Sequence, residues 1–111
     1  MIYFAQVDIP NGPIKIGIAK DINKRKKQFE KHMPWKLNII AQYPGGREVE
    51  KMIHRRFWKF QMRNSNGREW FNATEELLFW MDNIIITPSK IFFDPNERFI
   101  PQDKSNKKGG I

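Results

Sequence analysis

The chain has 111 residues, enough for one modest hydrophobic core and too few for two. An apolar fraction of 40% excludes a disordered chain, and the absence of cysteine excludes a disulfide scaffold, a thiolate zinc site and a cysteine nucleophile. The net charge of +8 points to a polyanionic partner, either nucleic acid, an anionic membrane or an acidic protein.

No apolar run is long enough to cross a bilayer, the longest aliphatic run being residues 84–86. Residues 1–10 contain Asp8 and no basic residue, so we do not expect a signal peptide. We therefore expect no membrane contact and a cytoplasmic location, which is the host cytoplasm if a phage encodes the protein.

The positive charge is concentrated in two segments. Residues 15–36 have a net charge of +6 and residues 47–68 of +5, whereas residues 69–85 have a net charge of −4. Solvated helix faces would account for either basic segment alone. Two basic segments around an aromatic-rich core favour nucleic acid, because phosphate contacts supply most non-specific affinity.

The first half of the chain predicts a hairpin and a helix. Residues 2–7 and 14–18 are rich in β-branched and aromatic side chains and are separated by a Pro-Asn-Gly-Pro turn. Asp21 is a suitable N-cap for a helix running to about residue 32. Arg25 shares the thin apolar face of that helix, although spacing does not separate it from Lys26.

A third strand is predicted at residues 37–43 and a second helix at about 47–60, whose apolar residues recur with a 3.6-residue period. Glu50 and His54 lie one turn apart at the margin of its apolar face. We expect both where the core meets a cleft.

The second half of the chain continues with a loop at residues 63–68 and a short extended segment at 69–71. Asn72 and Glu75 resemble a capping box that opens a third helix over residues 73–83.

This element order, β-β-α-β-α-(β)-α, predicts an α+β fold with a small, mostly antiparallel three-stranded sheet flanked by helices. We divide the chain into a domain at residues 1–87 and a C-terminal extension at 88–111, of which residues 105–111 are expected to be disordered.

Several short motifs occur in an ordered series: Ile2-Tyr3-Phe4, Lys15-Ile16-Gly17, then Arg25, Glu50 and a closing Glu69-Trp70-Phe71. In order and spacing, residues 1 to about 85 resemble the GIY-YIG nuclease superfamily, in particular a small phage and bacterial branch whose second motif reads KIG. Met1 replaces the glycine of the first motif, and Lys15 replaces the usual tyrosine of the second. Asn72 is the nearest counterpart of the late active-site asparagine.

The resemblance implies a metal-dependent DNA endonuclease with catalytic residues Tyr3, Lys15, Arg25, Glu50 and His54. Glu50 would hold a single Mg²⁺ or Mn²⁺, and Arg25 would brace the phosphate with its planar fork. Tyr3 would act as the base or would hydrogen-bond the attacking water, with Lys15 placed to lower its pKa. We expect one open sheet face, flanked by two helices, to bring these side chains together.

Each residue also has a structural alternative. Tyr3 is alternatively a strand aromatic, and Lys15 a solvated residue of the open face. Arg25 is alternatively a partner of Glu50 in an ion pair, and Glu50 a partner of His54 across one helical turn. For His54, two interpretations are equally consistent with the sequence: an exposed surface position, or a position next to Glu50 where it supports the metal ligand.

The basic side chains of the two helices and the following loop are predicted to contact the nucleic-acid backbone: Lys24, Lys26, Lys27, Lys31, Arg55, Lys59, Arg63 and Arg68. Trp35, Trp58 and Trp70 are possible stacking partners for bases, with burial the better explanation of Trp70.

Three functions are thus consistent with the sequence. The first is the endonuclease, the second a catalytically inactive GIY-YIG-fold module that binds nucleic acid, and the third a protein-interaction role. DNA is the expected partner, with RNA left open, and a homodimer on the substrate would allow both strands to be cut.

Overall fold

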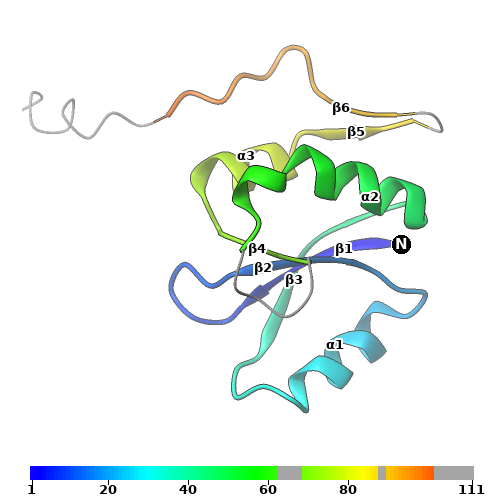
Figure 1. Cartoon of the computed structure of the whole chain (residues 1–111), viewed down its shortest axis with the longest axis vertical. Helices are drawn as coiled ribbons and strands as arrows, with labels where there is room; N and C mark the ends of the chain where they lie inside the picture. Colours follow the sequence, from blue (N-terminus) through cyan, green and yellow to red (C-terminus); the bar gives the residue numbers. More distant parts are fainter. Residues whose placement is uncertain (63–68, 88–89, 102–111) are drawn as a thin grey trace, which may run out of the picture.

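A computed structural model describes residues 1–62, 69–87 and 90–101. Its main sheet contains β1 (Ile2–Val7), β2 (Ile14–Ile18), β3 (Leu37–Tyr43) and β4 (Trp70–Phe71), in the order β3-β1-β2-β4. All neighbouring strands are antiparallel (Figure 1). The predicted α+β class is confirmed, and β4 adds a fourth strand to the sheet.

The β1–β2 hairpin is the centre of the sheet. Its turn uses Asn11 at a φ of 55° and Gly12, where a Cβ would lie 2.1 Å from the Val7 carbonyl oxygen, so a side chain is excluded there. The resulting register pairs Tyr3 with Gly17 and Ala5 with Lys15. Successive residues of each strand therefore face opposite sides of the sheet.

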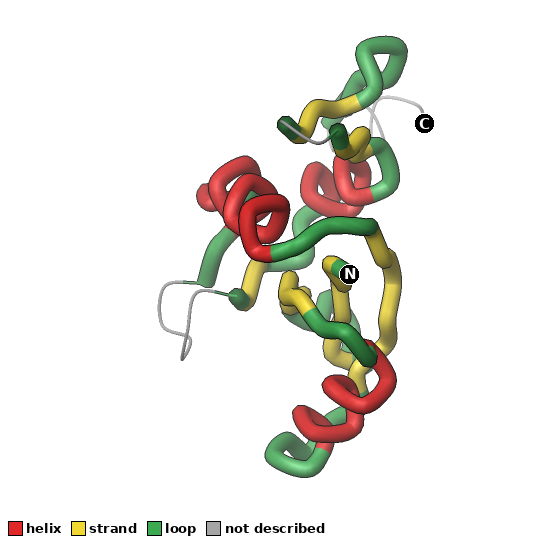
Figure 2. Tube along the Cα trace, turned by 90° about the vertical axis from the view of Figure 1, so that its right-hand side faces the viewer, coloured by secondary structure: helices red, strands yellow, loops and turns green. Residues whose placement is uncertain are grey.

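The helices lie on opposite sides of this sheet. Helix α1 (Ile22–Glu30) lies on one side, and α2 (Arg47–Arg56) and α3 (Glu75–Met81) lie on the other (Figures 1 and 2). The expectation that two helices flank one open sheet face is therefore wrong. The 3.6-residue pattern predicts a buried face for each helix, but it does not say which side of the sheet that face covers.

Each side of the sheet has its own core. Phe4 and Ile16 face α2 and α3, where they pack in a cluster with Ile53 and Leu77. The α1 side has a smaller cluster, built from buried Tyr3, Ala5, Val7 and Leu37, and covered by α1 residues such as Phe29. Tyr3 and Lys15 consequently belong to the α1 side.

The predicted N-cap of α1 is confirmed, because the Asp21 carboxylate accepts a hydrogen bond from the Lys24 amide at 3.0 Å. The helix ends at Glu30 rather than at residue 32. Helix α2 ends at Arg56, because Phe57 leaves the helical conformation at φ −105° and ψ 16°. A short 3-10 helix, η1 (Trp58–Phe60), follows, so the single helix predicted over 47–60 is wrong at its end.

The cap predicted for the third helix is also wrong. Thr74 is the N-cap of α3, since its hydroxyl accepts a hydrogen bond from the Leu77 amide at 3.0 Å. The Asn72 amide instead donates to the Phe60 carbonyl oxygen at 2.7 Å, which keeps the chain extended beyond β4. The helix starts at Glu75 and ends at Met81, not at 73 and 83.

A second, unpredicted hairpin follows α3. Strands β5 (Ile84–Ile86) and β6 (Ile91–Phe93) pair antiparallel, and the Phe93 ring lies 4.2 Å from that of Trp80 and 5.8 Å from that of Phe57, between centroids. The division of the chain at residue 87 stays a prediction. The loop at 63–68 and the tail at 105–111 lie outside the described residues. No described helix is long and apolar enough to cross a membrane.

The cap assignment can be checked by paired substitutions. Thr74→Ala is expected to lower the free energy of unfolding by about 1 kcal/mol, because the Leu77 amide loses its acceptor. Asn72→Ala, at an exposed position where the backbone makes the bond, is expected to change it by less than about 0.5 kcal/mol. Urea unfolding of both variants measures the difference, and equal losses would contradict the assignment.

Candidate active site

The phenol of Tyr3 lies directly over Gly17, its partner on β2. A Cβ at position 17 would lie 2.7 Å from Tyr3 Oη and 2.8 Å from Cζ, closer than real Cβ contacts allow. Only glycine leaves room for the ring in this position. The glycine of the second sequence motif thus serves to seat the tyrosine of the first.

Tyr3 is 3% exposed, and its surroundings favour the protonated phenol. Burial raises the pKa of Tyr3 to about 12, the negative charges of Glu69 and Glu50 add to the rise, and Arg25 opposes it. The expectation that Lys15 lowers this pKa is therefore wrong for the protein alone. Because Arg25 and both carboxylates act on the phenol, the four groups form one electrostatic cluster around it.

Lys15 is buried, with 3% of its surface exposed, so the alternative of a solvated residue is wrong. Its Nζ forms an ion pair with Glu69 and lies 4.1 Å from the centre of the Phe29 ring and 5.5 Å from that of Trp70. A buried ammonium needs such partners, because desolvation of an unpaired charge is costly. Glu69 thus neutralises the cation beside Tyr3. The sequence favours a structural over a catalytic role for Glu69 in the closing motif, but its spacing does not predict the ion pair with Lys15.

Arg25 is exposed on α1, and its guanidinium carbon lies 5.9 Å from the centre of the Phe29 ring. Among the described residues the ion pairs are Lys15–Glu69, Lys26–Glu30 and Lys59–Glu76. The alternative in which Arg25 pairs with Glu50 is therefore wrong. Its planar fork is left available to a phosphate.

Glu50 lies on α2, across the sheet from α1, and is half-buried. Its Oε2 is the buried side-chain atom without a hydrogen-bond partner in the described part of the chain. A buried carboxylate oxygen is rarely left unpaired, so this atom fits a cation or a water that the protein alone does not supply. No three His, Asp or Glu side chains of the described ranges form a metal-ligating group. A single carboxylate suits Mg²⁺, which keeps several waters.

His54 lies one turn after Glu50, and its Nε2 is 2.8 Å from the carbonyl oxygen of Ile16. Because a carbonyl only accepts, Nε2 carries the proton and donates it. This bond ties α2 to β2 between Lys15 and Gly17, and the ring also contacts Phe71, at 5.3 Å between centroids. His54 thus holds the helix that carries Glu50 against the strand that seats Tyr3.

The predicted nucleic-acid-binding residues fall into two groups on opposite sides of the sheet. Lys24 and Lys27 are exposed on α1, Lys31 is exposed at its C-cap, and Arg55 is exposed on α2. Lys26 pairs with Glu30 at 3.3 Å and Lys59 with Glu76 at 3.0 Å, so part of their charge is compensated. Arg63 and Arg68 lie outside the described residues.

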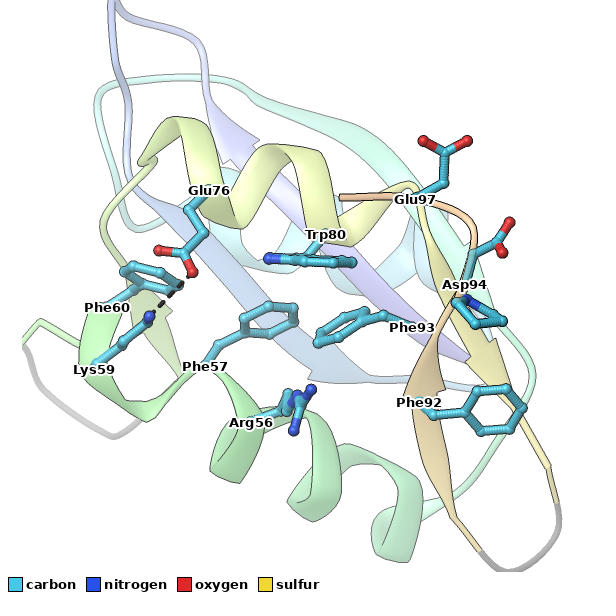
Figure 3. Close-up of a pocket in the computed structure, with 11 residues that line it drawn as sticks. Arg56, Phe57, Lys59, Phe60, Glu76, Trp80, Phe92, Phe93, Asp94 and Glu97 are labelled. Carbon is cyan, nitrogen blue, oxygen red and sulfur yellow. Dashed lines mark hydrogen bonds and ion pairs between the residues drawn. The ribbon is translucent and has the colours of Figure 1, made fainter. Parts of the chain in front are cut away.

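A cavity of about 650 Å³ contains none of these candidate catalytic residues. It lies on the α2 and α3 side of the sheet, over the rings of Phe57, Trp80 and Phe93, with Arg56 on one side and Asp94 on the other (Figure 3). The candidate catalytic residues are therefore grouped by their effect on Tyr3 and not by this cavity. We define the Tyr3 site as Tyr3, Arg25, Glu50 and the Lys15–Glu69 pair.

The fold and the Tyr3 site define a small α+β domain in which charges from two helices and from Glu69 act on a buried tyrosine. The family model of the T5orf172 domain matches residues 1–84, and the chain belongs to this family, which is GIY-YIG-like and associated with phage endonucleases. No curated protein and no solved structure matches the chain. Family membership therefore suggests a nuclease or DNA-binding function.

The close approach of Tyr3 to Gly17 predicts a steric effect. Gly17→Ala is expected to cost about 1–3 kcal/mol of unfolding free energy, because the new Cβ overlaps the phenol. Gly46→Ala is the control, since a Cβ there has no neighbour within 4 Å and only the N-cap preference of about 1 kcal/mol or less is lost. Urea unfolding compares the two, and a Gly17→Ala loss no larger than the control would contradict the steric argument.

The raised pKa predicts a measurable titration. The chain has two tyrosines, so Tyr43→Phe leaves Tyr3 as the only one. Its ultraviolet titration in EDTA should place phenolate formation near pH 12 rather than pH 10. The stabilisation linked to the raised pKa is present below pH 10 and is lost as the pH rises through about 12, since the unfolded chain releases its proton first. A transition near pH 10 in the folded variant would refute the burial of the phenol.

Proposed function

We propose that the protein is a metal-dependent DNA endonuclease that hydrolyses phosphodiester bonds at a GIY-YIG-type site, the Tyr3 site. The observation that carries this proposal is the unpartnered, buried Oε2 of Glu50 in the same electrostatic cluster as Tyr3 and Arg25. A carboxylate that can hold a metal ion, a planar cation and a phenol are groups that phosphodiester hydrolysis can use, and the charges of Glu50 and Arg25 both act on the Tyr3 phenol. Membership of the T5orf172 family supports the same conclusion.

Glu50 is the residue of this site that would hold a divalent cation, Mg²⁺ or Mn²⁺. When bound, such an ion supplies positive charge to the phosphoryl oxygens and makes a coordinated water more acidic. The position of Glu50 is fixed by helix α2, which the His54–Ile16 hydrogen bond ties to β2. His54 is thus a positioning residue in this proposal rather than a group that touches the substrate.

Arg25 binds the scissile phosphate. It projects from α1, is exposed and makes no ion pair among the described residues, so its donors are available to two phosphate oxygens at once. The negative charge that develops on these oxygens strengthens the interaction in the transition state. Lysine lacks the planar fork and would not replace it fully.

Tyr3 orients the attacking water. Its pKa of about 12 keeps the phenol protonated near neutral pH, so in the protein alone it acts through hydrogen bonds rather than as a base. Water attacks phosphorus, the bond from phosphorus to the 3′ oxygen breaks, and the water's proton passes to solvent or to the leaving oxygen. The products are a 5′ phosphate and a 3′ hydroxyl.

The exposed cations of α1 and α2 would hold the DNA backbone on either side of the site: Lys24, Lys27, Lys31 and Arg55. Contacts of this kind are independent of base sequence and weaken steeply as salt increases. They do not distinguish DNA from RNA. A homodimer on the substrate would allow both strands of a duplex to be cut.

A second candidate is the inactive nucleic-acid-binding module of the same fold. Two observations favour it: Lys15 is neutralised by Glu69, and Tyr3 has a raised pKa. Neither side chain is thereby prepared to activate water in the protein alone. This module would keep salt-sensitive binding without cleavage.

The decisive experiment is cleavage of supercoiled plasmid in Mg²⁺, Mn²⁺ or EDTA. We expect metal-dependent nicking that falls at least about 100-fold in Glu50→Gln and in Arg25→Ala, because each removes charge stabilisation from the transition state. Glu48→Gln on α2 and Asn23→Ala on α1 are matched controls, since both positions are exposed neighbours outside the Tyr3 site and outside the predicted DNA contacts. Their cleavage is expected to stay within about 3-fold of the unchanged protein.

Cleavage that persists in Glu50→Gln would overturn the assignment of the metal ligand. If the plasmid stays intact in every condition while salt-sensitive binding remains, the inactive module becomes the better description. If neither cleavage nor binding occurs, the nucleic-acid function fails altogether.

A further inference from the structure

A second pocket, of about 320 Å³, lies on the same side of the sheet as Tyr3 and Lys15. We call it the Trp35 pocket, and its walls include Ile9, Pro13, Met33, Trp35 and Trp70. Trp35 is 48% exposed and Ile9 39%, so two large apolar side chains are left in contact with water. Exposed apolar surface around a hollow commonly marks a binding site.

The Trp35 pocket adjoins the Tyr3 site through Trp70. This residue pairs with Lys15 across β4 and β2, and the Lys15 Nζ lies 5.5 Å from the centre of its ring. Met33 and Trp70 also pack against the core cluster that contains Tyr3. A group seated in the pocket would therefore lie one side chain away from the Lys15–Glu69 pair.

Charged residues adjoin the apolar walls of the pocket in the chain. Lys36 follows Trp35, is exposed and forms no ion pair in the described ranges. Asp8 precedes Ile9, and the Asp8 amide donates to the Lys36 carbonyl oxygen at 2.8 Å. Glu69 precedes Trp70 and is paired with Lys15. The lysine without an ion pair beside the apolar walls fits an occupant that combines a flat apolar surface with a negative charge. A nucleotide has both parts, a base and a phosphate.

We propose that the Trp35 pocket receives an unpaired nucleobase of the strand bound at the Tyr3 site, stacked on the Trp35 indole. The proposal rests on the proposed nucleic-acid function and deepens it, since it makes single-stranded or locally unpaired DNA the preferred ligand. A paired base cannot enter, because its faces are covered by its neighbours in the stack and its edge by its partner. Stacking on an aromatic ring accepts any base, so the pocket selects structure rather than sequence.

The test compares two ligands in EDTA, a fluorescein-labelled oligothymidylate and an oligomer of equal length made of abasic sites, by fluorescence anisotropy. The abasic oligomer keeps every phosphate but offers no base. The unchanged protein is expected to bind oligothymidylate at least about 5-fold more tightly, as one stacked base provides. Trp35→Ala should remove this preference while leaving the affinity for the abasic oligomer unchanged.

Two further variants make the result specific. Trp35→Phe retains an aromatic face and is expected to keep most of the preference. Trp58→Ala removes another indole, 66% exposed, that does not line the Trp35 pocket, and is expected to change neither affinity. A duplex of the same length should bind the unchanged protein and Trp35→Ala equally.

Three outcomes would overturn the proposal. The first is equal binding of both oligomers by the unchanged protein, which leaves nucleic-acid binding intact and excludes only the base pocket. The second is an equal loss of affinity for both oligomers in Trp35→Ala, which would mean that Trp35 supports the fold or binds a protein. The third is no binding of either oligomer or of the duplex, which would defeat the proposed function itself.

Discussion

The placement of the Tyr3 phenol against Gly17 is the constraint on which the rest of the structure depends. A Cβ at position 17 would overlap Oη at 2.7 Å, so the ring can occupy its position only over glycine. The hairpin register brings the two residues into line and, two positions along, directs Lys15 to the same face. The buried lysine then requires an acidic partner, and Glu69, the residue before β4, supplies it when β4 pairs with β2.

The other half of the site comes from across the sheet. Glu50 lies on α2, which packs with α3 on the face opposite Tyr3, yet its charge still acts on the phenol. β4 pairs with β2 at Ile14 and Lys15. The next residue of β2, Ile16, is bonded on both sides: its amide donates to the Glu69 carbonyl oxygen at 2.9 Å, and its carbonyl oxygen accepts from His54 Nε2 at 2.8 Å.

Local sequence patterns predicted much of the fold. The features that they did not predict depend on contacts between residues that are far apart in the sequence. The alternation in β2, the turn before it and the Asp21 cap are encoded within a few residues, and all are confirmed. The choice of Thr74 over Asn72 as a cap depends on a backbone bond from Asn72 to Phe60. The neutralisation of Lys15 depends on a partner 54 residues away, which no periodicity reveals. The resemblance to a known family selected the site residues, but it could not place the helices on opposite faces or show that the pKa of Tyr3 is raised.

Burial separates the candidate catalytic groups from the exposed cations. Tyr3 and Lys15 are almost wholly buried and Glu50 is half-buried, so the charge of Glu50 acts on the neutral phenol through a medium that screens little. The exposed lysines of α1 stand in water, where ions screen them and each contributes mainly to attraction of a polyanion. Arg25 belongs to both groups, because it is exposed like the lysines and yet acts on the pKa of Tyr3. In the proposed function, Arg25 is therefore the residue through which a bound phosphate would affect the buried cluster. A phosphate paired with Arg25 would offset the positive charge that opposes the rise in the Tyr3 pKa, so the phenol would stay protonated while the backbone is held.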